Sequence, residues 1–241
     1  MSSQQQTINI KQQALDILFE DNHLIVVNKK SSDIVQGDKT GDIPLSEKIK
    51  TYIKQKYNKS GDVFLGVTHR IDRPTSGIVL FAKTSKSLTR INQMFKDKEI
   101  KKTYLAITDN KPTENTGSLT NFLLKNEKQN KSFVYKDEKN GAKKAILHYK
   151  LINKSDNFFL LEVELETGRH HQIRCQLANI SCHIKGDLKY GAKRSNPDGS
   201  ISLHAWKIQF IHPVKKEMIE IIAPTPSENI WKEITSNIKL N

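Results

Sequence analysis

Apolar residues gather in short stretches along this chain, and polar turn-forming residues separate many of these stretches in pairs. Three such pairs stand out: residues 16–20 with 24–28, 145–152 with 158–166, and 203–211 with 218–223. Short apolar runs joined by turn residues are typical of β-hairpins, so we predict three hairpins. Two further apolar runs, 78–83 and 102–108, have the length of single strands.

Helical spacing of apolar residues occurs in three places. The first set follows a proline and recurs at offsets of 4, 7, 8 and 12 positions: Leu45, Ile49, Tyr52, Ile53 and Tyr57. We predict a second helix capped by Ser85, with one face formed by Leu88, Ile91, Met94 and Phe95. A shorter helix is expected after a glycine turn, with one face formed by Ile173, Leu177 and Ile180.

The order of these elements shows no regular βαβ alternation, and residues 125–144 are dominated by Lys, Asn, Glu and Gln. We therefore predict an exposed ribbon or loop at 125–144 within an α+β fold, built on a mixed, mostly antiparallel central sheet flanked by helices. Residues 1–13 carry few apolar groups and are expected to form a flexible tail. Residues 14–241 are expected to form a single domain.

The chain has 241 residues and a formal net charge of +13, from 39 Lys and Arg against 26 Asp and Glu. This excess favours a polyanionic partner, although a composition biased towards Lys, Asn and Ile raises the charge without any function. No apolar run approaches the about 20 residues of a membrane span, and the N-terminus lacks a hydrophobic signal core. These features predict a soluble, cytoplasmic protein in which Cys175 and Cys182 are reduced thiols.

The first candidate for chemistry is the sequence HRIDRPTSG at residues 69–77. Arg70 and Arg73 lie on either side of Asp72 and would favour its ionised form, which nucleophilic catalysis requires. A proline and a glycine in the same segment indicate a loop, where a neighbouring strand can present a catalytic group. The alternative is a surface turn with an ordinary ion pair, and this loop alone does not decide between the two.

The second candidate is LETGRHHQIR at residues 165–174, which runs from a predicted strand through a glycine turn into the short helix. Helical spacing places Arg174 at the shoulder of the buried stripe, where its guanidinium would be half buried. A half-buried guanidinium favours a carboxylate or phosphate partner. The alternative is an arginine whose charged end extends to solvent, which is common at a helix edge.

Together these two segments resemble the RluA-type family of RNA pseudouridine synthases. The similarity continues, in the order of that family, in EDNHLIVVNK at 20–29, KTYLA at 102–106, GDLKYG at 186–191 and LHA at 203–205. It covers about residues 14–225, and the short stretch before it implies the form without an N-terminal S4 RNA-binding module. The resemblance implies the pseudouridine synthase fold and an isomerase that converts specific uridines in tRNA or ribosomal RNA to pseudouridine.

The resemblance also implies roles for individual residues. Asp72 would attack the target nucleoside, Arg174 would pair with Asp72, and Tyr104 would pack against the uracil ring. Arg70 would fill the space left by a flipped base. The other expected RNA or substrate contacts are Arg73, Arg169, His171 and, in the floor of the pocket, Ile173. Because the reaction has no redox change or group transfer, no cofactor and no metal are expected; the partner is RNA, and the protein is expected to act as a monomer.

Other interpretations were weighed against this one. An RNA-binding protein with a degenerate site on the same fold is the main alternative, and the presence of Asp72, Tyr104 and Arg174 argues against it. A metal site is suggested by the His and Cys residues crowded into 170–183, but their spacing fits no zinc pattern. A kinase is excluded because HRID occurs without a glycine-rich loop or a DFG segment. Three departures from the family pattern bear on local loop shape and RNA choice: residues 30–33, Gln176 and residues 181–183.

Overall fold

The computed structural model describes residues 15–38 and 40–238, so the flexible tail expected at 1–13 lies outside the described residues. Its strands are β1 (Ile17–Glu20), β2 (Leu24–Lys29), β3 (Gly66–Val67), β4 (Ser76–Ala82), β5 (Lys101–Thr108), β6 (Thr116–Asn126), β7 (Lys131–Tyr135), β8 (Lys143–Lys154), β9 (Phe159–Leu165), β10 (Leu203–Ile211) and β11 (Met218–Ile222). Its helices are α1 (Leu45–Lys56), α2 (Ser85–Lys96), α3 (Gln172–Asn179) and α4 (Asn229–Thr235), with a 3-10 turn η1 (Leu188–Tyr190). Within the described residues, no helix is long and apolar enough to cross a membrane.

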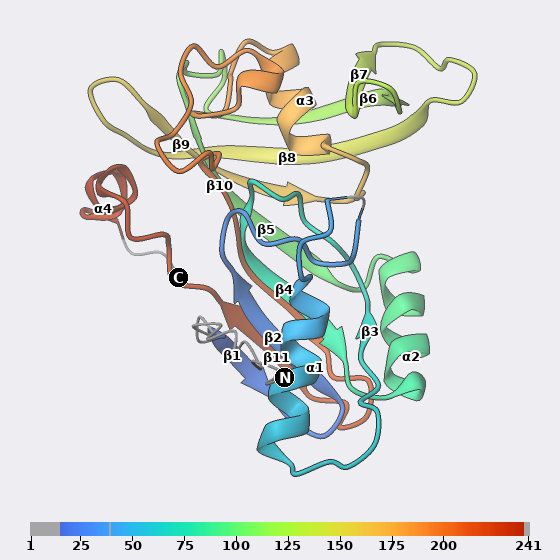
Figure 1. Cartoon of the computed structure of the whole chain (residues 1–241). Helices are drawn as coiled ribbons and strands as arrows, with labels where there is room; N and C mark the ends of the chain where they lie inside the picture. Colours follow the sequence, from blue (N-terminus) through green and yellow to red (C-terminus); the bar gives the residue numbers. More distant parts are fainter. Residues whose placement is uncertain (1–14, 39, 239–241) are drawn as a thin grey trace, which may run out of the picture.

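Within the described part of the chain, 11 strands form one sheet that runs through both halves of the molecule (Figure 1). Their order is β1-β2-β4-β10-β5-β9-β8-β6-β7, with β11 paired to β10 and β3 paired to β4. The pairing of β4 with β10 is parallel, and the other described pairings are antiparallel. The sheet is therefore mixed and mostly antiparallel, with helices beside it, which confirms the predicted α+β class.

The three predicted hairpins are confirmed as β1–β2, β8–β9 and β10–β11. In the first turn, the carboxylate of Asp21 accepts hydrogen bonds from the backbone N–H groups of His23 and Leu24, both at 2.8 Å. This local bonding is the reason that Asp favours turns. The single strands predicted at 78–83 and 102–108 correspond to β4 and β5.

The three predicted helices are also present, as α1, α2 and α3. The predicted N-cap of α2 was wrong, because Thr84 rather than Ser85 caps this helix. The Thr84 Oγ1 atom accepts a hydrogen bond from the backbone N–H of Ser87 at 3.2 Å. Thr and Ser are both good caps and follow one another here, so the sequence alone does not separate them. Helix α4 and the early part of β6 were not predicted.

Successive side chains of β4 point into two apolar layers, because strand residues alternate between the faces of a sheet. On one face, Val79 belongs to a buried cluster with Ile49 of α1. On the other, Leu80 belongs to a cluster with Ile91 of α2 and Ile173 of α3. The second layer therefore extends from the strand that follows HRIDRPTSG to the helix that follows TGRHH, and it joins the two candidate segments.

Gly77 explains the close approach of β4 to β10. Its φ angle is +109°, and a Cβ atom at this position would lie 2.3 Å from the carbonyl oxygen of Ala205. Only glycine avoids this clash and accepts this backbone conformation. The loop of residues 68–75, which directly precedes β4, is therefore held at a defined place beside the start of β10.

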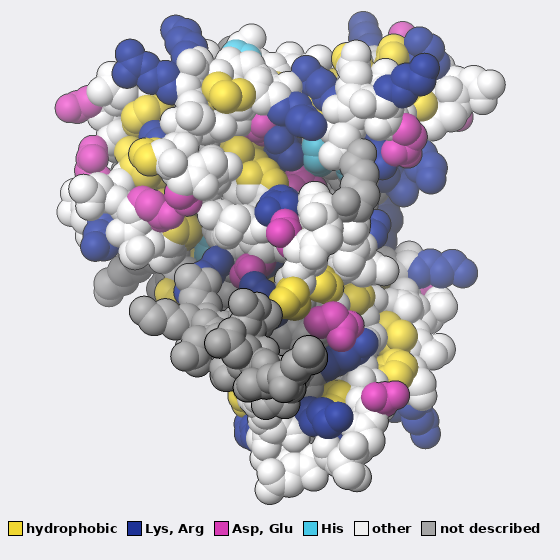
Figure 2. All heavy atoms as spheres, in the orientation of Figure 1, with side chains coloured by type: hydrophobic (Ala, Val, Ile, Leu, Met, Phe, Trp, Pro, Cys, Tyr) yellow, Lys and Arg dark blue, Asp and Glu magenta, His cyan; other side chains and the backbone are white. Residues whose placement is uncertain are grey.

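The predicted ribbon at 125–144 is confirmed: β7 lies within it and pairs with the end of β6. Figure 1 shows this ribbon in the upper half of the molecule next to α3, and α3 contacts both β6 and β7. Lys and Arg side chains gather over this part of the surface in Figure 2. The exposed lysines of the segment include Lys128, Lys136, Lys139, Lys143 and Lys144.

Candidate active site

Asp72 lies in the loop of residues 68–75, which joins β3 to β4. Its backbone carbonyl accepts a hydrogen bond from the N–H of Thr75 at 3.0 Å, which closes a turn just before β4. The ammonium of buried Lys29 holds the same loop, because it donates a hydrogen bond of 3.1 Å to the carbonyl of Arg73. The Asp72 side chain keeps 26% of its surface exposed. Its carboxylate is therefore fixed in position and still open to solvent.

Lys29 had no role in the sequence-based prediction, although it lies in one of the family segments. Its ammonium also donates hydrogen bonds to the carbonyls of Lys30 and Asp33, both at 2.8 Å. Three carbonyl acceptors match the three N–H bonds of an ammonium. Burial lowers the pKa of Lys29 to about 7, and the negative charges of Asp33 and Asp72 oppose this shift. A lysine that ends the apolar run LIVVNK was the available sequence signal for such a buried cation.

Arg174 of α3 is the cation that contacts Asp72. Its Nη1 donates a hydrogen bond to Asp72 Oδ2 at 3.0 Å, so the predicted pairing of these two residues is confirmed. The expectation that Arg174 is half buried was wrong, since only 5% of its side chain is exposed. The reason is that α3 is enclosed on several sides, with β6, β7 and η1 all in contact with it.

Asp187 is the second carboxylate of the site and was missed by the sequence reasoning. Its two oxygens accept hydrogen bonds from Nε and Nη2 of Arg174, at 2.7 and 2.8 Å. Burial by itself would lower the pKa of Arg174, but the bonds to Asp187 and the charge of Asp72 raise it above its ordinary value. Arg174 is therefore charged at physiological pH and presents a permanent positive charge to Asp72.

His171, directly before α3, faces the same carboxylate. Its Nε2 lies 3.6 Å from Asp72 Oδ2, and its backbone has a left-handed φ of 53°, which few residues other than glycine adopt. Burial, and then the positive charge of Arg174, lowers the pKa of His171 to about 2. The ring is therefore neutral at physiological pH. His171 was expected to contact RNA; only 8% of it is exposed, and the ring is directed at Asp72.

Tyr104 of β5 and Ile173 of α3 belong to one buried apolar cluster that also contains Ala205. Burial, and then the negative charge of Asp72, raises the pKa of Tyr104, so its hydroxyl stays protonated. A small cavity lies beside the ring, lined also by Ile78, Lys102 and Ala205. Tyr104 therefore lines a cavity, while Ile173, the other residue predicted to contact the uracil, belongs to the same apolar cluster but does not line this cavity.

His69, the first residue of HRIDRPTSG, lines the same cavity. Its Nε2 accepts a hydrogen bond from the backbone N–H of Leu80 at 3.0 Å. Burial lowers the pKa of His69 to about 3, so the ring is neutral and serves as a fixed acceptor. Its contribution is to attach the start of the Asp72 loop to β4.

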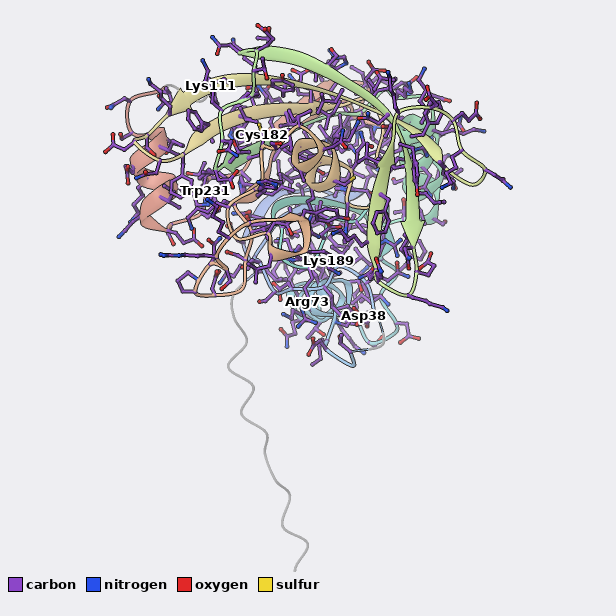
Figure 3. The ribbon with its side chains drawn as sticks, turned by 90° about the horizontal axis from the view of Figure 1, so that it is seen from above. Asp38, Arg73, Lys111, Cys182, Lys189 and Trp231 are labelled. Atoms are coloured by element: carbon purple, nitrogen blue, oxygen red, sulfur yellow. The ribbon has the colours of Figure 1, made fainter. Side chains whose placement is uncertain are left out.

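The remaining three predicted residues are exposed arginines. Arg73 makes an ion pair of 2.6 Å with Asp42, and Arg169 Nε donates a hydrogen bond to the carbonyl of Lys144 at 3.0 Å. Arg70 makes no ion pair or hydrogen bond with any residue that the structure describes. Arg70 and Arg73 were expected to favour the ionised form of Asp72 through their charge. Among the described residues neither one forms an ion pair or hydrogen bond with Asp72, and both side chains are exposed. Figure 3 shows Arg73 on the side of the molecule that carries Lys189, away from α4.

The His and Cys residues at 170–183 do not converge. Cys175 and Cys182 are buried free thiols, and burial raises the pKa of Cys175 to about 12. The ring of His170 is bonded to Ser132 and Asn130, at 2.9 and 3.1 Å. Among the described residues, no group of three or more His, Cys, Asp or Glu side chains is arranged to hold a metal ion.

Comparison with known proteins identifies the class to which this fold and site belong. Residues 23–179 match the family model described as RNA pseudouridylate synthase. The chain therefore belongs to the RNA pseudouridine synthases, enzymes that isomerise uridine to pseudouridine in RNA. Within this class it is of the RluA type, as its motifs implied.

Two relatives illustrate the similarity. The uncharacterized RNA pseudouridine synthase YhcT of Bacillus subtilis (strain 168) is 32% identical over 219 residues, which cover 89% of this chain and 70% of that protein. The ribosomal large subunit pseudouridine synthase C of Rickettsia prowazekii (strain Madrid E) is 34% identical over 212 residues, which cover 87% of this chain and 68% of that protein.

Solved structures show the same fold. Human RNA Pseudouridylate Synthase Domain Containing 4 aligns with a TM-score of 0.75 at 22% identity, over 88% of this chain and 89% of that chain. Human RNA Pseudouridylate Synthase Domain Containing 1 aligns with a TM-score of 0.69 at 19% identity, over 89% of this chain and 85% of that chain. The predicted pseudouridine synthase fold is therefore confirmed.

Proposed function

We propose that this enzyme isomerises specific uridines of ribosomal RNA or tRNA with Asp72 as its nucleophile. The observation that carries the proposal is the state of this carboxylate. A buried, permanently charged Arg174 binds its Oδ2, while 26% of the side chain stays exposed. A carboxylate that is hydrogen-bonded to a fixed cation and still open to a ligand is suited to nucleophilic attack.

The chemistry proposed for Asp72 needs nothing that the chain does not provide. The carboxylate bonds to the ribose carbon as the glycosidic bond from N1 to that carbon breaks, and the uracil turns within the pocket. A carbon–carbon bond from C5 to the same ribose carbon then forms as the bond to Asp72 breaks, which frees the carboxylate, and the proton lost from C5 is balanced by one gained at N1. No electron is transferred to an outside acceptor, so we propose that neither a cofactor nor a metal takes part.

Tyr104 and Ile173 are proposed to hold the uracil while it turns. Both belong to one apolar cluster, Tyr104 lines the cavity described above, and a protonated tyrosine offers a flat apolar face with a polar tip. Such a wall can hold a planar ring without fixing its rotation by hydrogen bonds. Arg70, exposed and unbonded within the described chain, is proposed to occupy the gap that the flipped base leaves in the RNA.

The basic surface is proposed to bind the RNA backbone. The net charge is +13, and exposed lysines cover the ribbon next to α3 (Figure 2). Contacts between lysine or arginine and phosphates dominate the affinity of most RNA and DNA complexes. Arg73 and Arg169, both exposed, are proposed to add contacts of the same kind close to the site.

Ribosomal RNA of the large subunit is the substrate that the relatives favour. Proteins named ribosomal large subunit pseudouridine synthase C or D from Rickettsia, Buchnera and Zymomonas are 31 to 34% identical to this chain. We propose that the enzyme acts on such RNA in the cytoplasm as a monomer, with tRNA as the second candidate. Because no metal is proposed to take part in the reaction, the activity should survive a metal chelator.

In vitro modification tests this proposal. The purified protein is incubated with transcripts of large-subunit ribosomal RNA and with a tRNA pool, in the presence and absence of EDTA, and pseudouridine is mapped at each position. We expect conversion at one or a few uridines of the ribosomal RNA, equal with and without EDTA. Conversion of tRNA alone would replace the proposed substrate, and loss of activity in EDTA that zinc restores would overturn the metal-free mechanism.

A further inference from the structure

A chain of hydrogen bonds leads from the ribbon through Tyr190 to His171, which lies next to Asp72; the proposed function gives Tyr190 no role. The backbone N–H of Ser132 in β7 donates to the hydroxyl oxygen of Tyr190 at 2.8 Å. The same oxygen lies 2.9 Å from Nδ1 of His171. Ser132, Tyr190 and His171 are all buried, so solvent offers few competing partners.

The direction of the second bond follows from counting protons. A backbone N–H can only donate, so the oxygen of Tyr190 accepts from Ser132. Burial raises the pKa of Tyr190, so the hydroxyl keeps its single proton. Nδ1 of His171 is the described acceptor for that proton. If His171 donated instead, the hydroxyl proton would have no acceptor among the described residues, and a buried unpaired donor is unfavourable.

The tautomer of His171 then follows. An Nδ1 atom that accepts a hydrogen bond carries no hydrogen itself. The single N–H hydrogen of a neutral imidazole therefore lies on Nε2. Nε2 faces Asp72 Oδ2 at 3.6 Å, and Arg174 donates to the same oxygen at 3.0 Å. Both groups therefore lie on the Oδ2 side of the carboxylate: Arg174 is hydrogen-bonded to this oxygen, and Nε2–H of His171 faces it from beyond hydrogen-bond distance. No described side chain forms a hydrogen bond or ion pair with Oδ1.

Tyr190 also supports the second donor. The guanidinium carbon of Arg174 lies 5.1 Å from the centre of the Tyr190 ring, a cation–π distance. One residue thus fixes the protonation of His171 through its hydroxyl and packs against Arg174 through its ring. Exchange of the hydroxyl for hydrogen separates the two contributions, because Phe keeps the ring.

We propose that Tyr190 is a positioning residue for the reaction: its hydroxyl holds His171 as the Nε2–H tautomer, so that the hydrogen bond from Arg174 and the N–H of His171 both lie on the Oδ2 side of Asp72 and leave Oδ1 as the attacking oxygen. The proposal rests on the assignment of Asp72 as the nucleophile. Without the Tyr190 hydroxyl, Nδ1 of His171 is free to take the hydrogen, and a bare Nε2 lone pair would then repel the carboxylate. The carboxylate would turn, and its attack would slow.

Tyr190→Phe tests this, with Tyr52→Phe as the matched control. Tyr52 of α1 also has a hydroxyl that donates to a carboxylate, Glu20, at 2.9 Å, but it belongs to the other half of the fold. Single-turnover rates and RNA dissociation constants are measured on one stem-loop. We expect Tyr190→Phe to slow the chemical step by about ten- to a hundredfold, the range for a misplaced reacting group. Its RNA affinity and all values for Tyr52→Phe should match wild type.

Equal chemical rates for Tyr190→Phe and Tyr52→Phe would overturn the proposal, as would a loss confined to RNA affinity. A double variant adds a second check, because Tyr190→Phe should have little further effect in a His171→Gln background, whose amide keeps a donor near Asp72. Independent, multiplicative effects of the two substitutions would contradict the proposal that Tyr190 acts through His171.

Nitrogen NMR of the imidazoles tests the tautomer without any RNA. We expect the Nε2–H form of His171 in wild type and a mixture in Tyr190→Phe; an Nδ1–H form in wild type would overturn the proposal. This readout also separates the two levels of inference. A wild-type protein that converts no RNA but shows the Nε2–H tautomer would contradict the proposed function, while the effect of Tyr190 on the tautomer of His171 would still hold.

Discussion

The two sides of the Asp72 carboxylate are built in opposite ways. The buried side consists of His171, Arg174, Asp187 and Tyr190. Its side chains make polar contacts with one another and with Asp72 at distances of 2.7 to 3.6 Å. The open side consists of Arg70 and Arg73, both exposed. Arg73 pairs with a surface carboxylate, and Arg70 pairs with no described residue.

The difference teaches which part of the site the protein completes by itself and which part it leaves to the RNA. A charge that must be ready before binding is held by groups that are already desolvated and bonded, which requires no rearrangement during the reaction. Groups proposed to meet the substrate are exposed instead, and they are unbonded within the described chain, as Arg70 is, or held only at the surface, as Arg73 is, so that little has to break when RNA binds. Cations next to Asp72 in the sequence are therefore on the open side, and the cation that pairs with it comes from a helix 102 positions away.

The largest effect is expected at the carboxylate between the two sides. Asp72→Asn should abolish pseudouridine formation, because an amide is a poor nucleophile, and should leave RNA affinity within a few fold, because affinity rests mainly on phosphate contacts. Single-turnover assays and filter binding measure both quantities. Substantial residual turnover would remove Asp72 from the nucleophile's role.

The next largest effect should come from the buried side. Arg174→Ala leaves the carboxylate of Asp187, which is only 1% exposed, without its cation, and loss of one partner of a buried ion pair costs about 3–5 kcal/mol. Urea unfolding should show this loss of unfolding free energy together with a loss of activity. Arg169→Ala is the control, since its exposed side chain makes a single bond to a backbone carbonyl. An Arg174→Ala protein that unfolds like the control would contradict the contrast between the sides.

A smaller and more selective effect is expected for Arg70→Ala on the open side. The free protein loses no described bond, so its melting temperature should match wild type. Turnover should fall more on a folded stem-loop than on an unstructured oligonucleotide, because extrusion of a stacked base costs a few kcal/mol. Equal impairment on both substrates would show that Arg70 does not act in base flipping.

Arg73→Ala should have the smallest effect. Its ion pair with Asp42 joins side chains that are 45% and 51% exposed, and exposed pairs contribute about 0–1 kcal/mol. If Arg73 contacts a phosphate, its loss should weaken RNA binding uniformly across sequences and reduce the salt dependence by about one charge. A stability loss as large as that of Arg174→Ala would erase the distinction between the two sides.

The same contrast explains what the sequence could predict. The three hairpins, two further strands and three helices that were predicted follow from apolar spacing over short stretches of sequence, and all are present, whereas α4 and the early part of β6 were missed. The pairing of Arg174 with Asp72 came from resemblance to a family, since no periodic pattern relates positions so far apart. The pairing of Asp187 with Arg174 was not predicted, because these hydrogen bonds depend on how the chain at η1 packs against α3. The exposed positions of Arg70 and Arg73 were not predicted, for a related reason: adjacency in a loop does not determine which way a side chain turns.

The shared sheet has a mechanical consequence. The loop of Asp72 leads into β4, Tyr104 lies on β5, and β10 is bonded to both strands. Backbone hydrogen bonds therefore fix the distance between the start of β4, which follows the Asp72 loop, and the part of β5 that carries Tyr104, so these two parts of the sheet do not move towards each other when a substrate binds. The RNA has to supply the movement. We expect the preferred uridines to be those whose surroundings deform easily, so that flexibility of the RNA, as much as its sequence, selects the site of modification.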